Sequence, residues 1–152
     1  MAVGDTYTDL GLTTKIAVGK PATEDQLGYG ALSWIEWGCV VSLPQRGDTV
    51  EDIAEPCLSS GRNEHFGGMK DGGILEIPFK FVEGDAGQAL VRAAAGTNDV
   101  YSIQEVDIDG TATFYYGRFQ AVQRRESTTS SNKGYIAMFA VNSDRFTGTE
   151  EV

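Results

Sequence analysis

Residues 83–96 read EGDAGQALVRAAAG and carry the clear helix pattern of this chain. Asp85 has the side chain of a helix N-cap, Gln88 three residues later completes a capping box, and Gly96 suits a left-handed C-cap. The apolar stripe between the caps is narrow and rich in alanine, and it consists of Ala86, Leu90, Val91 and Ala94. A helix this short is unstable alone, so we expect it to lie flat against a sheet, where small residues permit a close approach.

The segments on both sides of the helix have strand patterns. Residues 74–82 alternate between apolar and polar side chains, and Pro78 cannot donate to a ladder, so this strand is at an edge or bulged. Residues 100–108 and 111–124 are joined by an Asp-Gly turn at 109–110, which is the strongest short hairpin signal. We therefore expect antiparallel β-structure around the helix.

The last expected strand, residues 134–141, reads GYIAMFAV and is apolar on both faces. A strand with one face in solvent would alternate with polar residues, so the second face is predicted to be covered as well. The cover would be the helix or a neighbouring subunit.

The first half of the chain is less regular. Residues 13–18 predict a short strand and residues 19–30 predict a loop. Residues 33–41, SWIEWGCVV, predict a strand whose core face consists of Ile35, Trp37, Cys39 and Val41. In this interpretation Cys39 is a small buried residue.

Residues 56–73, PCLSSGRNEHFGGMKDGG, follow a weak strand pattern at 49–54 and contain five glycines. We interpret this segment as a long projecting loop or a loose hairpin. Long irregular segments inside a compact domain are usually functional, or are ordered only on binding.

The totals suit one β-rich domain. A chain of 152 residues suits a single domain, 1–152, and 19 glycines fit the many turns of an all-β fold. The 22 acidic residues exceed the 12 basic ones and give a net charge of −10. This acidic surface favours solubility and repels nucleic acid instead of gripping it.

The N-terminal sequence and the cysteines bear on the compartment. The start, MAVGDTYTDLG, lacks the basic and apolar regions of a signal peptide, and no apolar run approaches the roughly 20 residues of a membrane span. We therefore expect a soluble protein made in the cytoplasm, without membrane contact and with Cys39 and Cys57 as free thiols.

No catalytic or metal-binding pattern stands out in the sequence. A Ser-His-Asp site would have to use the single histidine, His65, and no nucleophile elbow is present. A zinc site would need His65 with both cysteines and an acid. The run DIDGT at 107–111 resembles the start of a calcium loop, but the later ligands are missing, so a hairpin turn is the better account. We expect no enzyme activity, no cofactor and no metal.

Several side chains are candidates for contacts with a neighbouring molecule. Arg124 and Arg125 form the basic cluster of note, and they would pair with acids of a neighbouring subunit, end a solvated strand, or contact nucleic acid. Trp34 is either an interface anchor or is partly buried under residues 19–30. The candidates within residues 56–73 are His65, Phe66 and Met69.

The order of strand, capped helix, hairpin and long final strand resembles the major tail tube proteins of long-tailed (siphovirus-like) phages and gene transfer agents. The stretch that carries the likeness is FKFVEGDAGQALVRAAAGTNDVYSIQEVDIDGTATFYYGRFQAVQRRES at 79–127. It includes the Ala-Leu pair at 89–90, the Asp-Gly turn, and an aromatic-Gly-Arg step at 116–118. With the polar loop and closing strand that follow, the likeness covers about residues 73–146.

The resemblance implies a mainly β fold, an antiparallel β-sandwich or partly closed barrel flanked by one short helix at about 85–95. It implies hexameric rings stacked into a tube whose acidic lumen conducts duplex DNA during ejection without binding it specifically. The implied partners are copies of the chain itself, a tape measure protein inside the tube, and tail terminator and distal tail proteins. The implied location is the virion tail, and type VI secretion tubes share the architecture.

The candidate lumen residues are acids that parity or position places opposite the core, namely Glu51, Glu55, Glu76, Glu105 and Asp107. In a tube, residues 56–73 would be ordered by the ring above or below. Two other classes remain open: a non-enzymatic β-sandwich binding module, such as a capsid decoration or receptor-binding domain, and a hydrolase with an unrecognised site.

Overall fold

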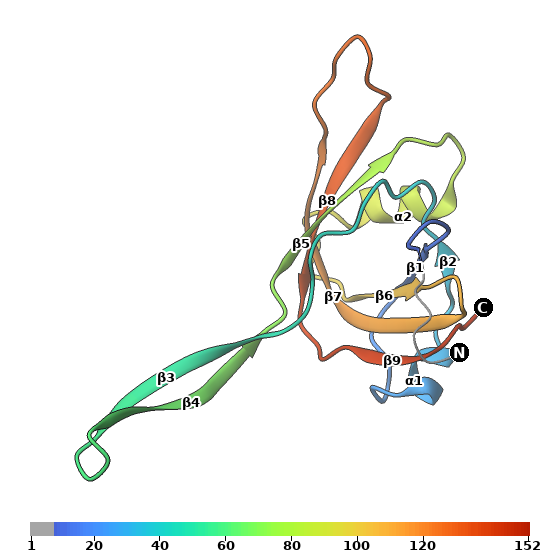
Figure 1. Cartoon of the computed structure of the whole chain (residues 1–152). Helices are drawn as coiled ribbons and strands as arrows, with labels where there is room; N and C mark the ends of the chain where they lie inside the picture. Colours follow the sequence, from blue (N-terminus) through green and yellow to red (C-terminus); the bar gives the residue numbers. More distant parts are fainter. Residues whose placement is uncertain (1–7) are drawn as a thin grey trace.

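The computed structural model describes residues 8–152 and consists mainly of antiparallel β-structure (Figure 1). A body contains both helices and most of the strands, and one long hairpin extends away from it. The elements in chain order are β1 (Thr13–Val18), α1 (Gln26–Gly30), β2 (Ile35–Glu36), β3 (Thr49–Cys57), β4 (Arg62–Asp71), β5 (Ile74–Lys80), α2 (Ala86–Ala94), β6 (Tyr101–Val106), β7 (Thr111–Arg124), β8 (Gly134–Val141) and β9 (Phe146–Thr149).

The body is built on a seven-stranded antiparallel sheet in the order β2-β1-β6-β7-β8-β5, with β9 paired to β7. The long strand β7 organises this sheet, because it pairs with β6, β8 and β9. Its register shifts between Phe119 and Ala121, where a bulge re-aims the strand. The sheet curves around the core, and the end strands β2 and β5 are not paired with each other.

The larger core cluster lies between the sheet and α2. Its aromatic side chains meet edge to face: the ring centroids of Phe119 and Phe139 are 4.8 Å apart, and those of Trp37 and Phe79 are 5.4 Å apart. Val91 and Ala94 of α2 join the same cluster and are fully buried. The helix is thus held by packing on the sheet, as its short apolar stripe predicts.

One of the two hydrogen bonds of the predicted capping box forms at the N-terminus of α2. The Asp85 carboxylate accepts from the backbone N–H of Gln88 at 3.0 Å. The Gln88 side chain does not return to the cap: it accepts from Val82 N–H at 2.9 Å and donates to the carbonyls of Gly38 at 2.8 Å and Lys80 at 2.6 Å. Gln88 therefore ties the helix to the end of β5 and to the segment after β2.

The close approach expected of a helix rich in small residues occurs at Gly87. A Cβ atom there would overlap the carbonyl oxygen of Glu36 and lie 2.9 Å from the Trp37 Cα atom. The predicted stripe is wrong at Ala86, which is exposed, while Gly87 and Gln88 are buried. The first turn of the helix faces β2 through Gly87 and Gln88, while Val91 and Ala94 are buried as predicted.

A smaller core cluster lies on the other side of the sheet under α1 and β9. Tyr29 of α1 stacks on Phe114 with ring centroids 4.9 Å apart, and Phe146 of β9 packs against both. Residues 19–30, predicted to be a loop, therefore contain a short helix. Asp25 caps it by accepting from Gly28 N–H at 2.8 Å, and this contact lowers the pKa of the Asp25 carboxyl.

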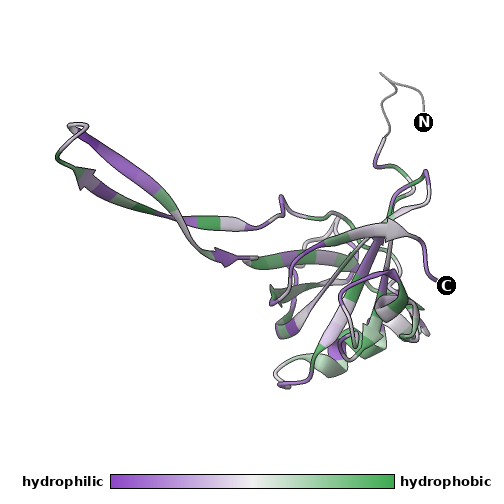
Figure 2. Ribbon diagram, turned by 90° about the horizontal axis from the view of Figure 1, so that it is seen from below, coloured by the Kyte–Doolittle hydropathy of each residue, from purple (hydrophilic) through white to green (hydrophobic). Residues whose placement is uncertain are grey.

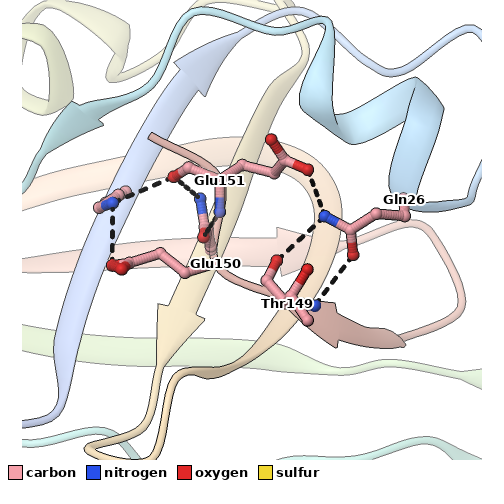
Figure 3. Close-up of polar contacts among 6 residues, drawn as sticks. Gln26, Thr149, Glu150 and Glu151 are labelled. Carbon is pink, nitrogen blue, oxygen red and sulfur yellow. Dashed lines mark hydrogen bonds and ion pairs between the residues drawn. The ribbon is translucent and has the colours of Figure 1, made fainter.

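The C-terminal end of the chain is fastened to this same region (Figure 3). The Gln26 side chain donates to the Thr149 carbonyl at 3.0 Å and to the Glu151 carboxylate, and accepts from Thr149 N–H at 2.9 Å. Gln104 of β6 exchanges two hydrogen bonds with the backbone of Glu151. Lys15 of β1 donates to the Glu150 carboxylate at 3.2 Å, so three elements of the body hold this end.

The strand predicted for residues 33–41 is wrong over most of its length. Only Ile35–Glu36 pairs as a strand, and Ile35 is partly exposed. Cys39 adopts a left-handed φ of 54° and is exposed, so it is not the buried residue predicted from parity. Trp37 alone of the predicted core face is buried, because the chain turns after it and rejoins β5 through the bridge between Val40 and Phe79.

Candidate assembly surfaces

The hairpin formed by β3 and β4 stands away from the body (Figures 1 and 2). Its strands pair with each other from Thr49↔Asp71 to Cys57↔Arg62, and the turn closes with Gly61 N–H donating to the Cys57 carbonyl at 2.9 Å. Residues 56–73, predicted to be a loop or loose hairpin, thus contain a regular ten-residue strand, Arg62–Asp71. The hairpin has no second layer, since nearly every residue in it is exposed.

One face of the hairpin, which we name the acidic face, carries a pair of apolar side chains with acidic side chains on both sides. Ile53 lies opposite Phe66, and both remain more than two-fifths exposed. Glu55 lies opposite Glu64 two pairs nearer the tip, and Glu51 lies on the other side of Ile53 near Gly68. Like charges placed directly opposite each other on neighbouring strands are destabilising.

The other face of the hairpin holds His65, whose Nδ1 lies 2.9 Å from the Asp52 carboxylate. The predicted interface candidates His65 and Phe66 are neighbours in sequence and therefore lie on opposite faces. Met69 lies beside the register shift and is 80% exposed. All three side chains are accessible in the single subunit.

A second exposed surface is the outer face of β5 and β8, defined as Ile74, Pro78, Ile136, Met138 and Ala140. The cross-strand pairs Ile74↔Ala140, Glu76↔Met138 and Pro78↔Ile136 place these residues together. They belong to neither core cluster, and the three β8 side chains are half-buried. The sequence predicts that both faces of β8, GYIAMFAV, are covered. In the structure its core face is buried, and its second face is only partly buried.

A third surface, the basic pole, lies where β5 ends and β8 begins. It is defined by Arg92, Arg124 and Lys133, which lie near the rings of Phe81 and Tyr135. The Lys133 ammonium lies 4.2 Å from the Phe81 centroid, and the Arg92 guanidinium lies 5.3 Å from Phe81 and 5.7 Å from Tyr135. The aromatic faces hold these cations in place without neutralising them.

The two arginines of the predicted basic cluster have different surroundings. Arg125 folds onto its own loop and donates to the Asn132 carbonyl from both Nε, at 3.3 Å, and Nη2, at 2.9 Å. Arg124 lies beside Tyr135 in the ladder and is exposed. Of the pair, Arg124 is the one free to meet another molecule.

Glu105 does not have the open position expected of a lumen residue. It is 4% exposed, and its carboxylate lies 2.5 Å from Arg46 and 3.5 Å from Arg145. The Arg145 guanidinium also lies 4.4 Å from the ring of Tyr115, whose pKa is raised by burial and secondarily by Glu105. The sequence indicates this burial, because Glu105 lies on the same face of β6 as the core residues Tyr101 and Ile103.

The other candidate acids are exposed at three separate places. Glu51 and Glu55 lie on the hairpin, Glu76 lies on the outer face of β5, and Asp107 lies at the turn between β6 and β7. The pKa of Asp107 is raised, first by partial burial and then by the charge of Asp109. These residues do not form one cluster in a single subunit.

Trp34 packs inside the subunit. Its indole N–H donates to the Tyr29 carbonyl at 3.0 Å, and its ring lies 5.8 Å from Phe114. Partial burial against residues 19–30, one of the two alternatives for Trp34, is the arrangement within the single subunit.

Among residues 8–152, no group of three or more His, Cys, Asp or Glu side chains is arranged to hold a metal ion. Within the same range, neither helix has the length and hydropathy required to cross a membrane.

No protein-family model and no curated protein sequence matches this chain. Solved structures do match in fold. A chain of the SPP1 tail tube has a TM-score of 0.63 at 12% identity and covers 92% of this chain and 78% of its own. A chain of the PVC sheath–tube complex, from an extracellular contractile injection system in its extended state, has a TM-score of 0.62 at 9% identity and covers 97% and 95%. A chain of the tube-terminating cap of the anti-feeding prophage has a TM-score of 0.61 at 10% identity and covers 99% and 95%.

These identities are low, so the likeness concerns the fold. The fold of this chain is mainly β, antiparallel and similar to that of tail tube chains along nearly its whole length, as its sequence predicts.

Proposed function

We propose that this chain is a structural, non-enzymatic subunit of a phage-type tail tube that assembles into stacked hexameric rings. The observation that carries the proposal is the fold likeness to tube chains, which extends over more than nine-tenths of this chain. The partners in this proposal are other copies of the chain, a tape measure protein inside the tube, and terminator and distal tail proteins at its ends. Its site of action is the virion tail of a long-tailed phage or a gene transfer agent.

Two surfaces of the single subunit support assembly. The outer face of β5 and β8 presents half-buried apolar side chains outside both core clusters. The hairpin exposes Ile53 and Phe66 without a second layer. An isolated two-stranded hairpin is marginally stable in water, so a partner that packs on it stabilises it.

The net charge of −10 supports the lumen part of the proposal. An acidic wall repels duplex DNA and lets it pass without adhesion, over a range of about 8 Å at physiological salt. Glu51, Glu55, Glu76 and Asp107 remain candidates for this wall because they are exposed, whereas Glu105 is neutralised by its arginines.

The test of the architecture is the mass of the purified protein as a function of concentration, with electron microscopy of the concentrated sample. We expect rings or tubes to appear as the concentration rises, and the hairpin to be cut by protease before assembly and protected afterwards. A compact single-copy particle at every concentration would favour the binding-module alternative.

The test of the lumen charge is a chain with Glu76→Lys and Asp107→Lys. We expect its tubes to assemble and to release DNA more slowly than wild-type tubes. Release at the wild-type rate would remove the electrostatic part of the proposal and leave the architecture intact.

A further inference from the structure

We propose that residues 42–48 form a latch that closes on the free edge of β5 and joins the hairpin to the body through one uninterrupted antiparallel ladder. The chain between β2 and β3 passes beside β5, and in this structure only its first part is paired to that strand (Figure 1). The inference concerns the single subunit, so it goes beyond the proposed function and does not depend on it.

The ladder is formed on both sides of the latch and is interrupted between them. Before the latch, Val41 N–H donates to the Pro78 carbonyl of β5 at 2.8 Å. After the latch, β3 pairs with β4 from Thr49↔Asp71 onward. Because β4 is followed directly by β5, both paired parts join the same two stretches of the chain, and the latch lies in the gap between them.

The register of the first paired part is compatible with closure. In antiparallel pairing, each step forward along one strand is a step back along the other, and every second pair exchanges two backbone hydrogen bonds. Continued from Val41 and Pro78 through the gap, this register produces two further hydrogen-bonded pairs, Leu43↔Glu76 and Gln45↔Ile74.

Two residues of the latch suit a closed ladder. The register of the hairpin differs by one residue from the register before the gap, and a bulge at Gly47, which has a φ of 147°, would absorb that residue. Pro44 lies between the two residues that would pair with β5, so its missing N–H would point away from the ladder. Proline is tolerated in this position of an edge strand.

The backbone groups that would form the two new pairs are unpaired in the open form. Ile74 and Glu76 direct their N–H and C=O groups away from β8, because the alternate residues of β5 carry the ladder to β8. Among residues 8–152, no backbone–backbone hydrogen bond involves Ile74, Glu76, Leu43 or Gln45. A free edge is a template for another strand, and the pairs on both sides of the gap leave the latch as the segment in place to supply it.

Two side chains hold the latch open. The Arg46 guanidinium lies 2.5 Å from the Glu105 carboxylate and donates to the Pro44 carbonyl at 3.1 Å. Leu43 packs against the larger core cluster, whereas in a closed ladder its side chain would lie on the outer face beside Glu76. Closure therefore exchanges these contacts for the backbone hydrogen bonds of two residue pairs.

The two forms differ in how the hairpin is attached to the body. In the open form the hairpin continues the body through β4 and β5, while the other strand of the hairpin, β3, is separated from the paired part at Val41 by the unpaired latch. In the closed form both strands of the hairpin would continue the sheet, so backbone pairing would fix the direction of the hairpin. The latch is thus a conformational device whose position depends on the contact between Arg46 and Glu105.

The first experiment measures amide hydrogen exchange by NMR in the free subunit, with and without the Arg46 contact. The N–H groups of Ile74 and Glu76 are unpaired in the open form, so we expect them to exchange quickly in the wild type. Arg46→Gln releases the latch, and we expect both amides to exchange about tenfold more slowly as it closes. The matched control, Arg125→Gln, removes the same charge from an arginine that donates to Asn132 of its own loop, and we expect wild-type exchange.

The second experiment tests the register with a crosslink in a chain that carries Cys39→Ser and Cys57→Ser. Gln45→Cys with Ile74→Cys places two thiols directly opposite each other in the closed ladder, where a Cα separation of about 5.5 Å permits a disulfide. We expect mild oxidation to join this pair, and to do so faster when Arg46→Gln is added. The control pair, Gln45→Cys with Glu76→Cys, lies on the diagonal at about 7–8 Å and should form a disulfide about tenfold more slowly. Circular dichroism and thermal unfolding establish that each variant is folded.

Each outcome supports or overturns the latch. Exchange at Ile74 and Glu76 that stays at the wild-type rate in a folded Arg46→Gln chain would overturn it. Slow exchange of both amides already in the wild type would also overturn it, because the edge would then have another partner. Equal crosslinking of the direct and diagonal pairs, or of neither, would exclude the register. None of these results bears on the tube, which is rejected if the wild-type chain forms neither rings nor tubes.

Discussion

The body and the hairpin are both antiparallel β-structure, yet they differ in what their side chains contact. In the body, β7 and β8 place Phe119 and Phe139 in a closed core. In the hairpin, the corresponding cross-strand pair, Ile53 and Phe66, contacts water. Strand pairing is thus common to both regions, and only the body has a second layer. The difference teaches that side-chain burial stabilises the body, and that the hairpin gains little from it.

The largest expected difference is between two isoleucines. Ile77 of β5 is fully buried, so Ile77→Ala should lower the free energy of unfolding by about 4 kcal/mol through lost burial and a cavity. Ile53→Ala in the hairpin should change it by less than about 1 kcal/mol in the free subunit. Urea unfolding of both variants at low concentration measures this. Equal losses would mean that the hairpin folds as part of the body.

Substitution of glycine by alanine in each region tests how closely a second layer packs on the strands. Gly87→Ala introduces a Cβ atom where the Glu36 backbone lies, so we expect a loss of about 3 kcal/mol as α2 is pushed from the sheet. Gly67→Ala in the hairpin meets only the exposed Val50 side chain at 3.1 Å, and should change stability by about 1 kcal/mol or less. Thermal unfolding of the pair provides the comparison. An unaffected Gly87→Ala chain would contradict the close packing of the helix.

A carboxylate in each region provides a third comparison. Glu105→Gln leaves Arg46 and Arg145 without their shared partner, and we expect a loss of about 2 kcal/mol because the arginines retain some access to water. Glu64→Gln removes one of two facing like charges on the exposed hairpin, so stability should stay within about 0.5 kcal/mol of wild type. Chemical denaturation at neutral pH distinguishes them. A large loss for Glu64→Gln would reveal a partner for it within the subunit.

The smallest expected effect is a shift in thiol reactivity at the hairpin tip. Hydrogen bonds from Ser59 and Ser60 lower the pKa of Cys57 to about 7, whereas burial raises the pKa of Tyr29 in the body to about 12. In a Cys39→Ala background, the rate of alkylation by iodoacetamide should therefore rise with a midpoint near pH 7. Ser59→Ala should move the midpoint upward. An unmoved midpoint would exclude the hydroxyl as the main cause.

The sequence predicts the body well where local patterns decide the structure. The strands 111–124 and 134–141 have the predicted bounds, the turn between β6 and β7 contains Gly110 at a φ of 90°, and Gly96 has a φ of 76° after α2. Each of these signals depends on a few adjacent residues, such as an Asp-Gly pair or a helix cap. Distant parts of the chain do not alter them.

The errors lie where distant contacts decide. Cys39 follows strand parity in the sequence, but the chain turns there to reach β5, and the turn exposes the thiol. Glu105 is charged and its position in the sequence predicts an open side chain, yet Arg46 and Arg145 approach it from 59 and 40 residues away. Among the predicted interface candidates, Phe66 and Arg124 are accessible, and their role in an interface stays a prediction. The cations stacked on Phe81 become evident only when α2, β5 and β8 come together.

The placement of the hairpin at the beginning of β5 and of the basic pole at its end gives every copy a direction. The two ends of the strand differ in shape and in charge, so they cannot be exchanged by a rotation of the molecule. Any contact between the hairpin and a different part of a second copy is therefore heterologous.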